Sequence, residues 1–387
     1  MNGIIYHSTD PSNSKSNYIA GDTIDFILAN DASRDILLNS SYGIRIEGKL
    51  RVNETNGTGT GGTRQTDSEI VQMDHLTGIH GVIESIATEF QNSGQVELIN
   101  EYSRMHKSEQ CATKSLDDMN NAKQQVELKS NCEEASRQYC KGFYTDTLTE
   151  TAINDGTDAR IRDMDFSFKP SFALNHSSGN VPCAKSGFIK ISINTARDVN
   201  FLHGISQTAN NTYTLSDVRC CYYTVDANPN PPQISMRRIL NIKTSLNSTH
   251  ANLTARVPAV VSGMFANFQP SSNENTIVFN NNALHNLPNL NYVQFQFADS
   301  SSSYINYKIE DKGDQLHKFL ESIQSASGHS QVSADKWKSN DAWALGLNFN
   351  SAVDLSASKF NLEIDTAFDF STNPYVAYLY FISQVQL

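Results

Sequence analysis

The chain has 387 residues, a mass of 42.9 kDa and a net charge of −11 at pH 7. This length exceeds the size at which a single hydrophobic core stops growing, so we expect two β-rich domains, or one domain with a large insertion. The acidic balance excludes a general affinity for nucleic acid, because binding to phosphates needs clustered Lys and Arg.

The N-terminal residues 1–18 show no basic segment followed by an apolar run. We therefore expect no secretory signal peptide and a protein that stays in the cytosol. The N-x-S/T sequons at Asn175, Asn247 and Asn252 then carry little weight. None of the six cysteines forms a C-x-x-C pair with metal-ligand spacing. We expect reduced thiols at Cys111, Cys132, Cys140, Cys183, Cys220 and Cys221.

The clearest strand pattern lies at residues 42–52, where aliphatic residues alternate with Arg, Glu and Lys. The same period of two recurs at residues 189–194, 293–297 and 360–365. Such half-buried strands predict antiparallel sheets in layers. Weaker patterns predict further strands at residues 23–29, 85–90, 96–99, 166–174, 213–225, 239–246, 253–257 and 375–383.

Between residues 100 and 160 the alternation disappears. A helix is predicted there from Ser115, with Asp118 in the capping-box position, to Lys141 before Gly142. The neighbouring acidic pair 117–118 is explained as charge that complements the N-terminal end of the helix dipole.

The strongest helix prediction covers residues 314–324, with Asp314 as the N-cap. Its apolar face is formed by Leu316, Phe319, Leu320 and Ile323, so the helix should pack against a sheet. The most apolar segment, residues 375–382, is far shorter than the roughly 20 apolar residues that cross a bilayer. We expect a buried strand there and no transmembrane segment.

Together these elements predict an all-β-dominated fold: an antiparallel jelly-roll β-sandwich with an additional β-rich domain or insertion and a few short helices. A proline-rich connector at residues 226–232 indicates a domain boundary. Residues 1–228 would form the jelly roll, with a loop or helix excursion at about 100–160, and residues 229–387 a second β-rich domain. In the alternative, the C-terminal strands complete the jelly roll and the middle of the chain is an insertion domain.

Residues 57–62 match G-x-G-x-x-G. A dinucleotide site needs a helix N-terminus after this motif, whereas residues 63–73 have the pattern of loop and strand, so we expect a surface loop. Asp74, His75 and His80 lie close together, in a combination of residue types that metal sites and catalytic dyads use.

The spacing of these two histidines fits neither one helical face nor a zinc motif. We therefore expect a turn and a helix start, in which Gly78 and Gly81 permit tight packing. The local basic pair Arg237 and Arg238 does not change the expectation of no direct nucleic-acid binding.

The sequence contains no G-x-S-x-G elbow, H-E-x-x-H motif or P-loop, and no cysteine with a persuasive histidine partner. We therefore expect no enzyme and assign no catalytic, cofactor-binding or metal-binding residue. Trp337 and Trp343 flank residues 339–341, an arrangement that a carbohydrate-binding loop could use for stacking. Structural packing is favoured, and a receptor- or carbohydrate-binding β-sandwich module is the alternative function.

Seven segments carry a resemblance to a known family: residues 22–28, 37–50, 74–86, 101–104, 166–170, 187–194 and 213–217. In these segments and their order, the chain resembles the penton, or minor capsid, proteins of virophages and Polinton-like viruses, most closely those of the Sputnik type. The resemblance covers most of residues 17 to 300 in pieces. With this resemblance, the alternative receptor- or carbohydrate-binding β-sandwich module would lie on a virion surface.

The resemblance implies a structural virion protein with a jelly-roll subunit, five copies of which fill each fivefold vertex of an icosahedral capsid. Its partners would be further copies of itself, the surrounding major capsid protein with a double jelly-roll fold and other minor capsid proteins. It implies no cofactor, assembly in the host cytoplasm and a final location at the capsid vertex.

Overall fold

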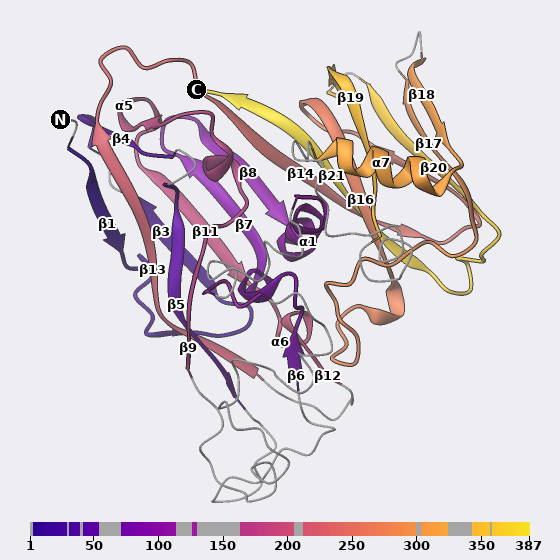
Figure 1. Cartoon of the computed structure of the whole chain (residues 1–387), viewed down its shortest axis with the longest axis horizontal. Helices are drawn as coiled ribbons and strands as arrows, with labels where there is room; N and C mark the ends of the chain where they lie inside the picture. Colours follow the sequence, from indigo (N-terminus) through magenta and orange to yellow (C-terminus); the bar gives the residue numbers. More distant parts are fainter. Residues whose placement is uncertain are drawn as a thin grey trace, which may run out of the picture.

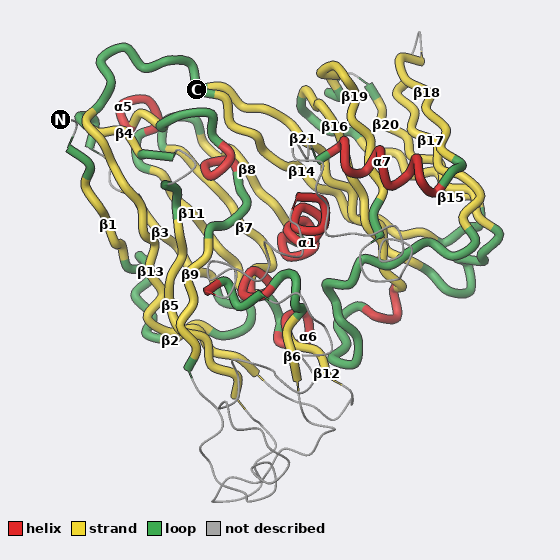
Figure 2. Tube along the Cα trace, viewed as in Figure 1, coloured by secondary structure: helices red, strands yellow, loops and turns green. Residues whose placement is uncertain are grey.

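The computed structural model describes residues 3–28, 31–38, 42–53, 71–113, 126–129, 163–204, 212–298, 303–323, 343–356 and 358–387. Most of these residues lie in strands, and the helices are few and short (Figures 1 and 2). In the described residues all paired strands are antiparallel, and the four larger sheets form two sandwiches, one built from the first part of the chain and one from the second (Figure 1). The predicted all-β, jelly-roll class of fold is confirmed.

The first sandwich consists of two facing sheets with a common apolar core. The main strands of one sheet, in spatial order, are β1 (Ile5–Thr9), β13 (Thr212–Asp226), β5 (Arg45–Asn53) and β9 (Met164–Phe168). Its short additional strands are β2 (Asn17–Tyr18), β4 (Arg34–Ile36) and β10 (Val181–Pro182). The facing sheet has the order β3 (Thr23–Leu28), β11 (Ile189–Thr195), β7 (Ile83–Phe90) and β8 (Gly94–Asn100). A separate ribbon pairs β6 (Val71–Met73) with β12 (Leu202–Gly204).

The second sandwich consists of two four-stranded sheets. One has the order β14 (Ser235–Leu246), β21 (Tyr375–Gln386), β16 (Val260–Pro270) and β19 (Leu345–Asp354). The other has the order β15 (His250–Ala255), β20 (Lys359–Thr366), β17 (Leu290–Ala298) and β18 (Ser303–Ile309).

The two sandwiches have the same topology. The eight main strands of the first, in chain order, are β1, β3, β5, β7, β8, β9, β11 and β13, and those of the second are β14 to β21. In each sandwich, the first, eighth, third and sixth strands form one sheet, and the second, seventh, fourth and fifth form the other. This arrangement of eight strands in two sheets is a jelly roll, so the chain contains two jelly rolls in tandem.

Most predicted strands are present, and the four alternating segments lie on β5, β11, β17 and β20. Sequence reasoning missed several strands, and two of these, β1 and β16, lack a burial pattern with a period of two. In β16, residues 263–269 are nearly all buried on both faces, whereas β1 is largely exposed on both. The strand predicted at residues 166–174 ends at Phe168, because a 3₁₀ helix, η3 (Ala173–His176), follows the turn after it.

The sheet formed by β14, β21, β16 and β19 is buried on both faces along its central strands, β21 and β16. In β21, Tyr375, Ala377, Leu379 and Phe381 belong to the core of the second sandwich. The residues between them, Val376, Tyr378, Tyr380 and Ile382, belong to the core that continues into the first sandwich. Residues 375–382 are therefore apolar throughout because both faces of the strand are covered, which confirms the predicted buried strand.

The predicted helix at residues 314–324 is α7 (Lys312–Ser322), which packs against β19 and β16. The predicted N-cap was wrong: Asp311, not Asp314, accepts hydrogen bonds from the backbone N–H groups of Gly313 and Asp314. The helix α1 (Tyr102–Thr113) was not predicted. The remaining short helices are η1 (Gly78–Val82), α5 (Cys183–Ser186), α6 (Asp198–Phe201) and η4 (Ser271–Asn273).

The G-x-G-x-x-G segment at 57–62 and the acidic pair 117–118 lie outside the described residues, as does the helix predicted from Ser115 to Lys141 except for residues 126–129. Within the described part of the chain, no helix is both long and apolar enough to span a membrane.

Candidate functional site at the junction of the sandwiches

Helix α1 lies between the two sandwiches, against the outer face of the doubly buried sheet (Figures 1 and 2). The hydroxyl of Tyr380 in β21 donates to the carbonyl of Glu101, just before the helix, over 3.0 Å. The Arg104 guanidinium lies 4.5 Å from the centre of the Tyr378 ring, a cation–π contact. Further along, Asn267 Nδ2 in β16 donates to Ser108 Oγ over 3.0 Å. These contacts fix the second sandwich to a helix of the first half of the chain.

The helix is polar in sequence but almost wholly buried. Its Lys107 has no exposed side chain and donates from Nζ to Asp74 Oδ2 over 2.6 Å. Asn280 Nδ2, from the second half of the chain, donates to the same oxygen over 2.6 Å. Burial alone would raise the pKa of Asp74, but the Lys107 ammonium holds it well below its ordinary value. Asp74 is therefore ionised and ties α1 to the second half of the chain.

Next to this ion pair, the rings of His80 and His106 are stacked with centroids 3.6 Å apart. The Tyr102 hydroxyl accepts from the backbone N–H of Ser171 over 2.8 Å and lies 2.9 Å from His80 Nδ1. If the Tyr102 hydroxyl donates this hydrogen bond, Nδ1 is the acceptor and the single ring proton of neutral His80 lies on Nε2. Burial, followed by the charge of Lys129, lowers the pKa of His80 to about 4, so this ring is neutral at pH 7.

A second buried ion pair, between Lys129 and Glu127, lies beside the two histidine rings. Lys129 Nζ lies 2.8 Å from Glu127 Oε2 and 2.9 Å from His106 Nε2. Because an ammonium only donates, His106 Nε2 must accept, so its proton lies on Nδ1, 3.0 Å from Ser171 Oγ. Burial would raise the pKa of Glu127, but contact with His80 and the Lys129 charge hold it well below its ordinary value. His80 Nε2 lies 3.4 Å from Glu127 Oε2, a loose contact rather than a full hydrogen bond.

We call these seven residues the junction cluster: Asp74, His80, Tyr102, His106, Lys107, Glu127 and Lys129. Two carboxylates balance two ammonium groups, and all seven side chains are buried. Among the residues that the structure describes, no group of His, Cys, Asp and Glu is placed to hold a metal ion. The polar atoms bind mainly one another, which suits a fixed structural joint rather than turnover of a substrate.

Of the three residues that the sequence singled out here, Asp74 and His80 are brought into the cluster, and His75 is only half-buried beside it. Sequence reasoning missed the other five members of the cluster. The expected turn and helix start is present as η1, which begins at Gly78. Gly78 has φ of +51°, and a Cβ there would lie 2.4 Å from the carbonyl oxygen of Glu127. Glycine is therefore required for this turn to pass over the cluster.

Further carboxylates lie along the same junction. Glu97 is 2% exposed and accepts from the backbone N–H groups of Ala173 and Ile239, over 2.6 and 2.7 Å. Burial raises the pKa of Glu97 to about 7, despite these two hydrogen bonds. Arg237 donates to Glu109 over 2.8 Å, and Arg238 donates to the carbonyl of Val96. Both arginines of β14 therefore face the first half of the chain rather than forming a surface basic patch.

The remaining sequence candidates lie elsewhere. Trp343 is 1% exposed and packs near Phe268, and Trp337 and residues 339–341 lie outside the described residues. Four cysteines are buried, and Cys132 and Cys140 lie outside the described part of the chain. The four are Cys111, Cys183, Cys220 and Cys221. Burial raises the pKa of the Cys183 thiol to about 11, which keeps it protonated and unreactive at pH 7.

Comparison with known proteins identifies the fold. No protein-family model and no curated protein matches the sequence. Among solved structures, a chain of the Sputnik virophage particle covers all of this chain and 86% of its own length, with a TM-score of 0.60 and 9% identity. The Faustovirus major capsid protein covers 100% and 90%, with a TM-score of 0.56 and 10% identity. VP54 of PBCV-1 covers 100% and 95%, with a TM-score of 0.55 and 10% identity. Each alignment spans both sandwiches, so the likeness is to the doubled jelly roll as a whole.

Proposed function

We propose that this chain is a structural virion protein whose two jelly rolls together form one building block of an icosahedral capsid. The observation that carries the proposal is the repeated jelly-roll strand order, together with a structural likeness to viral capsid proteins that covers the whole chain. A charge-balanced, buried junction cluster fits a non-enzymatic role, because its groups are engaged with one another. The proposed location is the capsid, with assembly in the host cytoplasm.

The proposed domains are residues 1–228 and 229–387, one jelly roll in each, joined by the proline-rich connector. Their interface is unlike a flexible domain contact, because β21 supplies alternate side chains to the cores on both sides. Ordinary inter-domain interfaces are more polar and allow relative motion. We therefore expect the two domains to move as one body.

Two places in a capsid are candidates for such a block. The sequence resemblance favours the fivefold vertex. There, five copies of the chain would form a homopentamer of jelly-roll subunits in contact with the major capsid protein and other minor capsid proteins. The doubled jelly roll favours the faces of the shell, because the similar structures include a major capsid protein whose alignment covers both sandwiches of this chain. Three copies would place six jelly rolls in a ring, which suits hexagonal packing. The geometry supports the face position better.

A receptor- or glycan-binding module around the two tryptophans is the competing function. It requires exposed aromatic faces on which a sugar ring can stack. Trp343 offers no such face, because it is 1% exposed.

Native mass spectrometry and negative-stain imaging of the purified full chain test the assembly. A trimer supports a place in the faces, and a pentamer supports the vertex. Each copy carries −11 net charge, so moderate salt should favour assembly by screening repulsion between copies. A protein that remains monomeric at high concentration and does not bind other capsid proteins would contradict a capsid role.

A further inference from the structure

One oxygen of the buried Asp74 carboxylate holds two side-chain nitrogen atoms. Lys107 Nζ and Asn280 Nδ2 each donate to Asp74 Oδ2 over 2.6 Å. The two nitrogens therefore lie within about 5 Å of each other. Lys107 belongs to α1 in the first half of the chain, and Asn280 lies between η4 and β17 in the second. An amine and a carboxamide from the two halves thus share one carboxylate.

The other oxygen of Asp74 fixes the orientation of this carboxylate. Asp74 Oδ1 accepts from the backbone N–H groups of Leu76 and Thr77 over 3.0 and 2.9 Å. These bonds leave Oδ2 for Lys107 and Asn280. Neither the Asp74 nor the Lys107 side chain is exposed, so bulk solvent does not compete for the shared oxygen.

The Asn280 carboxamide is polarised at its own oxygen. Asn280 Oδ1 accepts from the backbone N–H of Asn282 over 2.9 Å. Attack by a nucleophile on Cγ would place negative charge on this oxygen, and a backbone N–H aimed at it stabilises that charge, as in an oxyanion hole. The leaving nitrogen, Nδ2, already lies against the Asp74 carboxylate, which can carry a proton to it.

Lys107 becomes a nucleophile when it gives a proton to Asp74. Burial penalises both charged groups, so this transfer to a neutral amine and a neutral acid costs less here than it would in water. The ion pair is the state before reaction. A bond that forms once in each chain needs only a small population of the neutral pair.

We propose that Lys107 and Asn280 form an intramolecular isopeptide bond, with Asp74 as the catalytic proton carrier. Lys107 Nζ gives one proton to Asp74 and attacks Asn280 Cγ. A second proton passes from Nζ through the carboxyl group to Nδ2, the Cγ–Nδ2 bond breaks, and ammonia leaves. The Nζ–Cγ bond remains and Asp74 stays protonated, so no uncompensated charge is left and no co-reactant is needed. The bond would join the two jelly rolls covalently, whatever the protein assembles into.

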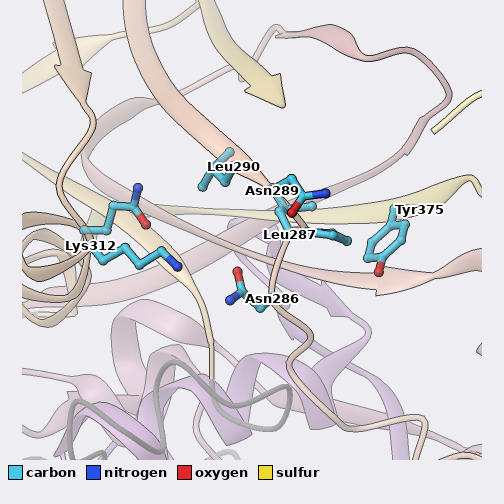
Figure 3. Close-up of a pocket in the computed structure, with 8 residues that line it drawn as sticks. Asn286, Leu287, Asn289, Leu290, Lys312 and Tyr375 are labelled. Atoms are coloured by element: carbon cyan, nitrogen blue, oxygen red, sulfur yellow. The ribbon is translucent and has the colours of Figure 1, made fainter. Parts of the chain in front are cut away.

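Lys312 provides a contrast within the same chain. It lines a surface pocket beside α7 together with Asn286 and Asn289 (Figure 3). Lys312 is exposed, and the described residues that line this pocket include no carboxylate. A lysine near asparagines does not by itself supply the proton transfer, so we expect no bond there.

Intact-mass spectrometry tests the proposal on the purified full chain, held folded at mildly alkaline pH until its mass no longer changes. The mass should be lower than that of the sequence by one molecule of ammonia. After digestion, one peptide should join the segments that contain Lys107 and Asn280, and trypsin should no longer cleave after Lys107. An unchanged mass would overturn the proposal. Loss of ammonia without the joined peptide would also overturn it, because cyclisation of another asparagine releases ammonia as well.

Three variants and a control assign the roles. Lys107→Arg keeps a cation beside Asp74, but a guanidinium does not give up its proton, so the full mass should remain. Asn280→Ala removes the reacting carbon and should also keep the full mass. Asp74→Asn should slow the loss of ammonia by about 100-fold or more.

Lys312→Arg is the matched control and should lose ammonia as the wild type does. Thermal melts establish that each variant is folded. Formation of the joined peptide at the wild-type rate in Asp74→Asn would contradict the role of Asp74, and loss of ammonia by Lys107→Arg would contradict the assignment of the nucleophile.

Discussion

The cores of the two sandwiches and the junction between them bury side chains in opposite ways. In β20, Phe360, Leu362 and Ile364 are buried while the residues between them are partly exposed, so burial follows a period of two. In α1, Arg104, His106 and Lys107 are buried next to one another. Burial in the cores needs only apolar side chains, whereas burial at the junction needs a partner for every charge. The junction therefore depends on particular pairs of residues, and one substitution that removes a partner there should destabilise the protein more readily than a conservative change in the cores.

The largest effect is expected from Lys107→Met. It leaves the Asp74 carboxylate buried without its cation, which should lower the free energy of unfolding by about 3–5 kcal/mol. Urea denaturation followed by fluorescence measures the loss. The matched control is Lys49→Met, which breaks the exposed pair with Asp217 and should cause no measurable change. Similar losses of unfolding free energy in both variants would show that the buried ion pair contributes no more to stability than the exposed one.

The double variant Asp74→Asn with Lys107→Met sharpens the comparison. Removing both charges should recover much of the stability lost by Lys107→Met alone, because no uncompensated ion remains. A core substitution has no such rescue: Leu362→Ala should cost about 2–5 kcal/mol through lost contacts and a cavity. If the double variant is no more stable than the single one, charge balance does not govern the junction.

A smaller effect, of about 1–3 kcal/mol, is expected from the pH dependence of Glu97. Its pKa is raised to about 7 in the folded protein, from 4.5, so the folded state binds the proton more tightly. The contribution of Glu97 to stability should therefore fall as pH rises from about 4.5 to 7 and stay constant above 7. His80 acts in the opposite sense: its pKa is lowered from 6.5 to about 4, so its contribution to stability rises as pH rises from about 4 to 6.5.

The stability difference between the wild type and Glu97→Gln separates these two terms. Denaturant titrations at several pH values should show the wild type losing stability relative to the variant between pH 5 and about 7. A constant difference across this range would mean that Glu97 does not titrate there.

The smallest effect is expected from Tyr378→Phe. It removes the hydrogen bond from the Tyr378 hydroxyl to Glu274 but keeps the ring under Arg104. A loss of about 1 kcal/mol is expected from denaturation curves. A loss above that of Leu362→Ala would show that this hydroxyl does more than the one hydrogen bond.

The same contrast explains what could be predicted from the sequence. The class of fold and strands such as β5 and β20 follow from alternation, because each covers one core with one face. The second jelly roll was not recognised: β16 lacks that alternation, and β19 was missed although Leu345, Leu347 and Phe349 alternate with Gly and Asn. The cluster depends on contacts distant in sequence, such as Asn280 with Asp74, and the pairing of these residues exists only once the chain has folded. Helix α1 was missed because its buried face carries charges rather than leucines.

We propose that the two jelly rolls form one rigid block of the proposed capsid, because they share a doubly buried sheet and a charged junction. Differential scanning calorimetry of the full chain tests this claim most directly. We expect a single transition in which the calorimetric and van't Hoff enthalpies agree. Two separate transitions, with one jelly roll unfolding while the other stays folded, would contradict it.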